Sequence, residues 1–266
     1  MTVTTELDYL KIEPAQEAAM ASTQRTVLPI HNGFFNDGHW HVLSSTSLGG
    51  SGLSAAEMDS RLRSQNPKGM NDLLQRGICL PLYIDCDCAL DNVVFVLGDL
   101  TEQEEAEWLG RIQMRLEIPC GEFMLVGSVL KDDFDVALQH FEPPNCEPFY
   151  KIKLKPGSYL VEVYAFLGSG PVNKALEDAL APLVQEWLNT DPRDQPQWLS
   201  FFQEDGYVEN EDIELLEHII RLVPTDADTP IPQVRDDINC WVGDFIMRKP
   251  LQCPQGLQRE EVIRQL

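Results

Sequence analysis

The sequence predicts an α+β fold in which largely antiparallel β-sheets pack in a sandwich-like way and carry a few amphipathic helices. Short extended segments recur between turns rich in Gly, Asn and Pro. Other segments place apolar residues at helical spacing. The two kinds of segment alternate irregularly, whereas a doubly wound parallel sheet needs regular alternation. With 266 residues, of which 43% are apolar, the chain can bury one large core or two small ones.

The first predicted elements are three strands, which are separated by Gly and Asn turns and lie at residues 26–30, 33–35 and 39–45. A link rich in Gly and Ser then leads to a short helix. Ser54 can cap the first turn of this helix, and Glu57, three positions later, completes a capping box. The sequence "NPKG", which begins at residue 66, predicts the end of the helix.

The centre of the chain, residues 77–99, contains two extended runs separated by "LDN", and this arrangement predicts a β-hairpin. In residues 83–90 the side chains alternate between an apolar face with Cys86 and Cys88 and an open face with two aspartates. The pattern predicts a strand with a buried, thiol-rich face.

Residues 100–116 predict a helix. Thr101 and Glu104 can form a second capping box, and acidic residues crowd the first turns, where the helix dipole favours them. Apolar residues recur at helical spacing at Trp108, Leu109, Ile112 and Leu116.

Two further strands are predicted at residues 122–130 and 158–166. In the second strand one face is apolar and consists of Tyr159, Val161, Val163 and Ala165. Residues 171–189 predict a helix, in which the interior residue Pro182 should cause a kink or a division.

The C-terminal part is harder to interpret, because residues 213–223 fit helical spacing and strand alternation almost equally. Residues 238–250 predict a last strand, and residues 253–266 predict a loop followed by a helical turn. For the whole chain we predict a flexible arm at residues 1–25 and a main α+β domain at residues 26–190. Residues 191–266 form an acidic segment and a final strand that pack on the main domain.

Charge is the extreme feature of the composition. The chain has 43 acidic and 20 basic residues, a formal net charge of −23. The imbalance lies in residues 71–266, which carry 36 acids and 15 bases, whereas residues 1–70 carry 7 acids and 5 bases. A polyanionic surface repels nucleic acid and anionic membranes and attracts basic proteins. We therefore expect no nucleic-acid or membrane partner and consider a basic protein partner; solubility alone would also explain the charge.

The sequence also predicts a compartment. It shows neither a leader of signal-peptide type nor a run of roughly 20 apolar residues, the length that a membrane span needs. The cysteines are odd in number, seven, and scattered, at Cys79, Cys86, Cys88, Cys120, Cys146, Cys240 and Cys253. This usage is typical of reduced thiols, so we expect a cytoplasmic protein.

A metal site can be considered at "HNGFFNDGHWHV", residues 31–42. His39 and His41 are two positions apart on a predicted strand, so their side chains would share a face, and Asp37 could add a third ligand. The spacing does not require a metal, because structural zinc sites normally show two closely spaced ligand pairs. The alternative is polar side chains that pack beside Trp40.

No catalytic residue and no cofactor can be assigned. The sequence contains no GxSxG, CxxC or HExxH pattern. Carboxylates are so abundant that any acid–base pair among them would be arbitrary. We therefore leave open whether the protein is an enzyme and favour a protein that is not.

Two acidic segments are candidates for partner binding, because aromatic and apolar residues interrupt the acids and so indicate ordered faces. The residues are Glu102, Glu104 and Glu105 in the first segment and Glu209, Glu211 and Asp212 in the second. Such faces can occupy the basic groove of a partner, although a solvated helix face is the simpler interpretation.

The segment "PGSYLVEVYAF", residues 156–166, resembles a strand found in small β-rich bacterial proteins, including competence and immunity proteins of the nuclease-inhibitor kind. The resemblance spans about a dozen residues, and no functional residue is carried across on it.

These observations favour a non-catalytic, acidic binding or regulatory protein that engages a basic protein partner, such as an inhibitor or immunity factor. One alternative is a metal-binding protein or metal-dependent enzyme that uses His39 and His41. A second alternative is a structural subunit of a larger assembly.

Overall fold

Two β-sheets form the body of the protein in a computed structural model, which describes residues 12–13, 25–30, 38–63, 65–86, 90, 92–127, 131–139, 148–205 and 215–264. The large sheet has the strand order β1 (Ile12–Glu13), β11 (Ile246–Arg248), β6 (Gly110–Ile118), β9 (Gly157–Ala165), β10 (His218–Pro224), β5 (Val93–Leu97) and β2 (Thr26–Pro29). The small sheet has the order β4 (Cys79–Tyr83), β3 (Trp40–Ser45), β7 (Glu122–Gly127) and β8 (Phe149–Lys153).

Most strand pairs are antiparallel; the described exceptions are the parallel pairs of β10 with β5 and of β1 with β11. The helices of the described residues are α1 (Ala55–Arg63), α2 (Pro67–Gln75), α3 (Glu102–Glu107), α4 (Lys131–Gln139), α5 (Gly170–Glu177), α6 (Ala181–Leu188), α7 (Gln197–Asp205) and α8 (Arg259–Arg264). The predicted α+β class with largely antiparallel sheets is confirmed.

The inner faces of the two sheets share one hydrophobic core. Phe95 of the large sheet makes a T-shaped contact with Phe123 of the small sheet, at 6.0 Å between ring centroids, and stacks on Tyr150 at 5.7 Å. The predicted apolar face of β9 points into this core, where Val161 and Val163 are fully buried. The two sheets therefore form the expected sandwich.

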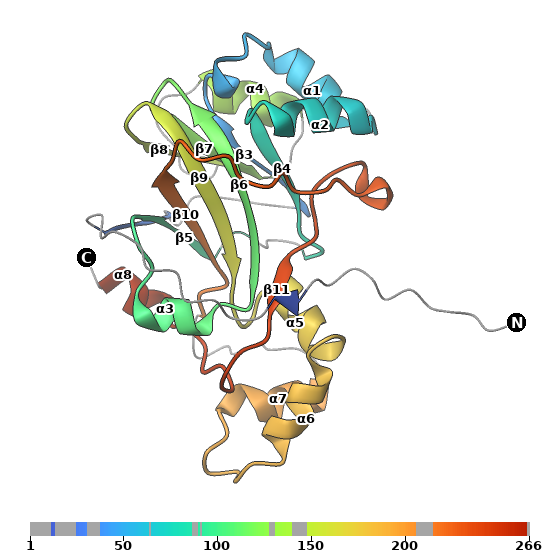
Figure 1. The fold of residues 1–266 in the computed structure, drawn as a ribbon, viewed down its shortest axis with the longest axis vertical. Helices are drawn as coiled ribbons and strands as arrows, with labels where there is room; N and C mark the ends of the chain where they lie inside the picture. Colours follow the sequence, from blue (N-terminus) through green and yellow to red (C-terminus); the bar gives the residue numbers. More distant parts are fainter. Residues whose placement is uncertain are drawn as a thin grey trace, which may run out of the picture.

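Helices cover the outer faces unequally (Figure 1). On the small sheet, α1, α2 and α4 bury a second core, in which Met58, Met70 and Phe134 pack against strand residues such as Met124. On the large sheet, α8 and the residues flanking α3 cover only part of the outer face, through Trp108 and Val262. Helices α5, α6 and α7 lie beyond one end of the sheets.

Three local predictions are confirmed. Ser54 and Glu57 cap α1: the Glu57 N–H donates to Ser54 Oγ at 3.3 Å, and the Ser54 N–H donates to Glu57 Oε2 at 2.8 Å. Thr101 and Glu104 form the second capping box. Pro182 is the second residue of α6, and residues 178–180 separate this helix from the end of α5 at Glu177, so the predicted helix is divided in two.

The first helix ends at Arg63, just before "NPKG", as predicted, but a second helix, which was not predicted, starts there. These residues begin α2: the Asn66 side chain accepts the N–H groups of Lys68 and Gly69, and Pro67 occupies the first helical position. Asn at the cap followed by Pro is a start signal, and it outweighs the helix-breaking character of Pro.

The helix predicted at residues 100–116 is wrong beyond Glu107. Residues 110–118 form β6, which pairs with β9 along its whole length. Burial alternates along β6, with Ile112, Met114 and Leu116 facing the core. A spacing of four residues, as between Ile112 and Leu116, satisfies both the helical period and the period of two, so it could not distinguish them.

The hairpin predicted at residues 77–99 is also wrong. Strand β4 pairs with β3 in the small sheet, whereas β5 pairs with β10 and β2 in the large sheet. The chain therefore crosses from one sheet to the other between the two runs. The strand predicted at residues 83–90 ends at Tyr83, and residues 87–89 lie outside the described part.

In the C-terminal part, the ambiguous segment at residues 213–223 contributes strand β10, which lies between β9 and β5. The last strand is shorter than the predicted residues 238–250 and spans Ile246–Arg248 only. The strand predicted at residues 33–35 lies outside the described residues. The proposed domain limits stay a prediction.

Candidate functional site

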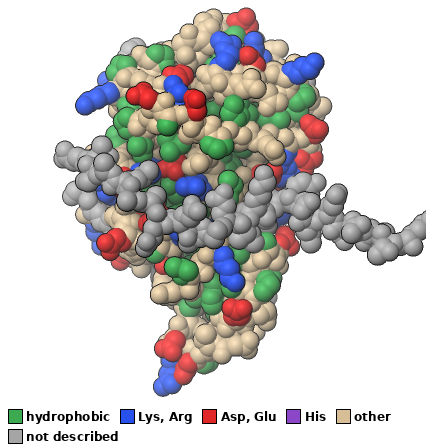
Figure 2. All heavy atoms as spheres, viewed as in Figure 1, with side chains coloured by type: hydrophobic (Ala, Val, Ile, Leu, Met, Phe, Trp, Pro, Cys, Tyr) green, Lys and Arg blue, Asp and Glu red, His purple; other side chains and the backbone are tan. Residues whose placement is uncertain are grey.

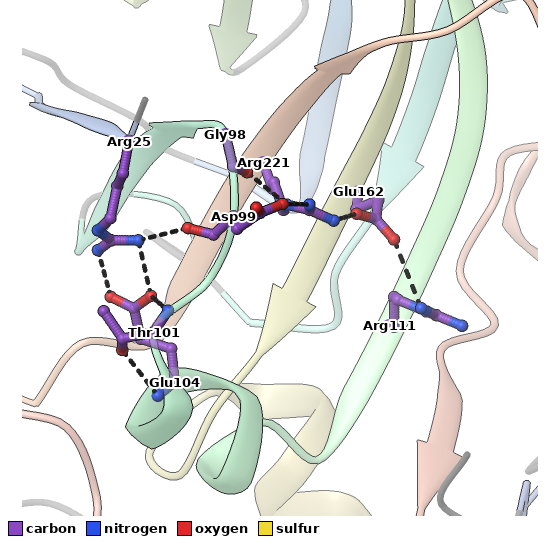
Figure 3. A network of polar contacts seen from close by, with 8 residues as sticks. All are labelled: Arg25, Gly98, Asp99, Thr101, Glu104, Arg111, Glu162 and Arg221. Atoms are coloured by element: carbon purple, nitrogen blue, oxygen red, sulfur yellow. Dashed lines mark hydrogen bonds and ion pairs between the residues drawn. The ribbon is translucent and has the colours of Figure 1, made fainter. Parts of the chain in front are cut away.

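The outer face of the large sheet carries a row of charged side chains (Figure 3). Glu162 on β9 lies directly opposite Arg221 on β10, and Arg111 on β6 is its diagonal neighbour. Arg221 Nη1 donates to Glu162 Oε2 at 2.6 Å, and Arg111 Nη1 donates to Glu162 Oε1 at 3.4 Å. Glu162 is 2% exposed and Arg221 is 4% exposed, so this pair is removed from water.

Arg221 also ties the end of β5 into the cluster. Its Nε donates to the Gly98 carbonyl at 2.6 Å, and its Nη2 donates to Asp99 Oδ1 at 2.9 Å. Burial by itself would lower the pKa of Arg221, but the carboxylate of Glu162 and the hydroxyl of Tyr164 outweigh it and raise that pKa above its ordinary value. The guanidinium therefore stays charged.

Arg25 extends the cluster to the N-terminal side. Its two Nη atoms donate to the two carboxylate oxygens of Glu104, at 2.9 and 2.6 Å, and Nη1 also donates to the Asp99 carbonyl at 3.0 Å. Glu104 is 1% exposed and at the same time accepts the N–H of Thr101. We call the connected set Arg25, Asp99, Glu104, Arg111, Glu162 and Arg221 the ion network.

Another buried arginine, Arg248, lies at the C-terminal end of α3. Arg248 donates to the carbonyls of Glu105, Ala106 and Trp108, at 2.8, 2.8 and 2.6 Å, and so binds carbonyls that a helix terminus leaves without partners. Its guanidinium lies 3.8 Å from the centre of the Trp108 ring. Burial lowers the pKa of Arg248.

The ion network is suited to a structural role, because its arginines hold neighbouring strands and α3 together. Its buried carboxylates are matched by guanidinium groups, which do not exchange protons at neutral pH. It contains neither a nucleophile nor a general base poised near neutral pH. The sequence did give a signal for it, since Glu162 and Arg221 each interrupt an apolar strand, where a charge must be paired to be buried.

The predicted partner-binding residues separate into three groups. Glu102 and Glu105 are exposed on α3. Glu104 must be removed from the predicted set, because its buried carboxylate is bound to Arg25 and to the N-terminus of α3. Glu209, Glu211 and Asp212 lie outside the described residues.

The described structure places two of the three predicted metal ligands, so the predicted site stays a prediction. His41 on β3 is fully buried and faces the core between the sheets, whereas His39 is half-buried, with Nδ1 3.2 Å from the Ile84 carbonyl. Asp37 lies outside the described residues. Within the described ranges, no group of three or more His, Cys, Asp or Glu residues could hold a metal ion.

Burial dominates the chemistry of His41. It lowers the pKa of this imidazole to about 3, and the nearby His218 of β10 contributes in the same direction. His41 is therefore neutral near pH 7. The two histidines come from different sheets and lie at the same end of the shared core.

A hollow of about 380 Å³ lies beside β6. Arg115 at its wall pairs with Glu117 at 3.0 Å and with Asp228 at 3.3 Å, so this arginine is already bound to two carboxylates. The described residues that line it include no histidine or cysteine.

No protein-family model matches the chain. No curated protein matches it either. Among solved structures, the chain is similar to a protein described as "Crocagin biosynthetic gene J", with 13% sequence identity and a TM-score of 0.31, over 77% of this chain and 99% of that one. In the described part of the chain, no helix has both the length and the apolar character to cross a membrane.

Proposed function

We propose that the protein is a non-catalytic binding protein that engages a basic protein partner through exposed carboxylates. One observation supports this proposal: in the described part of the chain, most arginines are bound to carboxylates, whereas many exposed carboxylates form no ion pair. The described arginines are already paired with carboxylates in nearly every case, at Arg25, Arg61, Arg63, Arg76, Arg111, Arg115, Arg193, Arg221, Arg235, Arg248 and Arg264.

The carboxylates that remain are numerous and exposed. Among the described residues, no ion pair involves the exposed acids Glu102, Glu177, Asp178, Glu186, Asp194, Asp226 and Glu261. On the face drawn in Figure 2, acidic and basic side chains are interspersed among neutral ones. The excess negative charge is therefore spread over open positions on several elements, and it does not neutralise itself.

This distribution of charge would mainly raise the rate of association with a basic partner. Open carboxylates raise the rate at which a basic partner meets the protein, and salt screens the attraction over roughly 10 Å at 0.1 M ionic strength. Folded elements such as α3 would hold the acids in fixed positions, so the partner would not have to order them on binding.

The test uses defined probes. Peptides of equal length with a net charge of about +6, zero and −6 would be titrated into the full chain at low and high salt. We expect only the cationic peptide to bind, with a dissociation constant that rises with salt. Replacement of Glu102 by Gln should weaken binding, mainly through slower association. Absence of binding, or binding that is indifferent to salt, would contradict the proposal.

The metal-binding alternative rests on His39, His41 and Asp37. Elemental analysis of the purified protein distinguishes it, because stoichiometric zinc, copper or iron would favour that alternative. The third prediction, a subunit of a larger assembly, can be checked by native mass measurement.

A further inference from the structure

Aromatic residues gather at one end of the small sheet, on the face opposite the shared core. Trp40 on β3 and Tyr83 on β4 are cross-strand partners, with ring centroids 4.7 Å apart. The Trp241 ring lies 4.9 Å from that of Trp40, and the His39 ring lies 5.6 Å from that of Tyr83. We call these four residues the aromatic platform. Trp241 is 4% exposed, whereas the other three are half-buried and so keep part of their surface exposed.

The segment that follows β10 holds the platform in place, and Figure 1 shows it passing beside β4. Trp241 Nε1 donates to the Leu62 carbonyl at 3.0 Å, and the Tyr83 N–H donates to the Val242 carbonyl at 2.7 Å. The turn before Trp241 places Asn239 and Cys240 at φ of 58° and 65°, the left-handed region. Residues other than glycine rarely adopt this backbone region unless surrounding contacts enforce it. The contacts around the turn therefore hold its backbone conformation.

Carboxylates surround the open side of the platform. The Tyr83 hydroxyl donates to Asp85 Oδ1 at 3.1 Å. Arg235 pairs with Asp237 and, at 3.1 Å, with Asp244. The pKa of Tyr83 is raised by burial first and then by Asp85 and Asp237, while Arg235 opposes the rise, so these charges lie close to the ring.

The carboxylates outnumber the cations at this place. Lys174 of α5 is the second cation and lies 4.0 Å from Asp85 Oδ2. Asp236, next to Asp237 in the same turn, is exposed and adds a fourth carboxylate to the surrounding segments. The side chains of Asp85 and Asp237 are 66% and 62% exposed, so a ligand can reach them.

Open aromatic rings bordered by carboxylates have the chemistry that recognises a guanidinium group. The negative face of a ring attracts a cation, and the planar guanidinium can stack on it while donating to carboxylates. A lysine ammonium offers no planar face. The chain already contains such an arrangement within itself, where Arg248 stacks on Trp108. Because the platform rings pack against one another at about 5 Å, a cation would lie on their outer faces and not between them.

We propose that the aromatic platform is the surface that receives an arginine side chain of the basic partner. This inference rests on the proposed function and adds to it the place of contact and the chemistry of the side chain. The neighbouring carboxylates would supply the attraction, and the rings would supply the preference for guanidinium over ammonium.

The experiment compares two cationic peptides of equal length and charge, hexa-arginine and hexa-lysine, titrated into the full chain at one salt concentration. We expect hexa-arginine to bind roughly 2- to 5-fold more tightly, the range that an exposed cation–ring contact provides. In Tyr83→Leu and in Asp237→Asn this ratio should fall to about 1. Asp237 is largely exposed, so its variant keeps the test valid if Tyr83→Leu fails to fold.

The matched control is Glu102→Gln on α3, far along the chain from the platform, which should weaken both peptides equally and leave their ratio unchanged. A wild-type ratio of 1, or a ratio that both platform variants retain, would overturn the inference, while salt-sensitive binding of both peptides would leave the proposed function standing. If neither peptide binds, the proposed function fails, and the inference fails with it.

Discussion

The ion network and the surroundings of the aromatic platform both place arginine and carboxylate groups near aromatic rings, on the two outer faces of the sandwich, but they differ in exposure. In the network, Glu162 and Arg221 are 2% and 4% exposed, and Glu162 accepts from two arginines. Beside the platform, the side chains of Asp85 and Asp237 are more than half exposed. Where water is excluded, these groups bind one another and hold elements of the fold together. Where they are exposed, they are available to a partner.

The difference in exposure implies a difference in energy. A buried ion pair is costly to break, because the partner that remains is left charged in a medium that solvates it poorly. An exposed pair contributes roughly 0–1 kcal/mol, because water solvates each partner almost as well as the pair does. Unfolding measurements on matched variants therefore test whether the buried pairs contribute more to stability than the exposed ones.

The largest effect is expected from Arg221→Met in the ion network. The change keeps much of the side-chain volume but leaves Glu162 buried without its closest cation and removes the donors to Gly98 and Asp99. We expect the free energy of unfolding to fall by about 3–5 kcal/mol at pH 7, measured by urea denaturation.

The control is Arg193→Met, because Arg193 pairs with Asp191 on the surface and its side chain is 87% exposed. That variant should change stability by less than about 0.5 kcal/mol. If the two variants lost similar amounts of stability, the ion network would not be the tie that its burial indicates.

The sequence predicted the local signals well because short-range chemistry determines them. The capping boxes at Ser54 and Thr101 each need only residues three positions apart, and the division at Pro182 needs only one residue. Strand β9 was also predicted with the correct faces, because Tyr159, Val161 and Val163 recur at every second position and are aromatic or β-branched residues, which favour strands.

The long-range pairing could not be predicted in this way. Cys79–Tyr83 and Val93–Leu97 are both buried on both faces, so neither run carries information about its partner strand or its sheet. The candidate sites share this limit. Glu162 and Arg221 are 59 residues apart, and Tyr83 and Val242 meet only because the segment after β10 returns to β4.

A second prediction concerns the buried side of β3, behind the platform. The pKa of His41 is lowered to about 3 by burial and by His218, whereas an unfolded histidine titrates near 6.5. Below pH 6.5 the unfolded chain therefore binds a proton that the folded chain does not. Stability from this residue should fall by about 1.4 kcal/mol for each pH unit between 6.5 and about 3.

The measurement is urea unfolding of wild type and His41→Leu at pH 7, 6 and 5, with the difference between their pH slopes as the result. Carboxylates titrate in both proteins and cancel in that difference. Equal slopes would mean that His41 is not held neutral in the folded state, and the end of the core would then be more open to water than its burial indicates.

The smallest effect is expected from Tyr83→Leu in the aromatic platform, and it decides whether the platform can be separated from the fold. The change removes a ring contact with Trp40 and the hydrogen bond to Asp85, both at half-buried positions. A paired aromatic ring contributes about 0.5–1.5 kcal/mol beyond its burial, so we expect a loss of about 1 kcal/mol, and a smaller loss for Tyr83→Phe, which keeps the ring. Urea denaturation of the two variants beside Arg221→Met provides the test. A loss as large as that of Arg221→Met would make Tyr83 a structural tie, and the contrast between a closed network and an open platform would no longer hold.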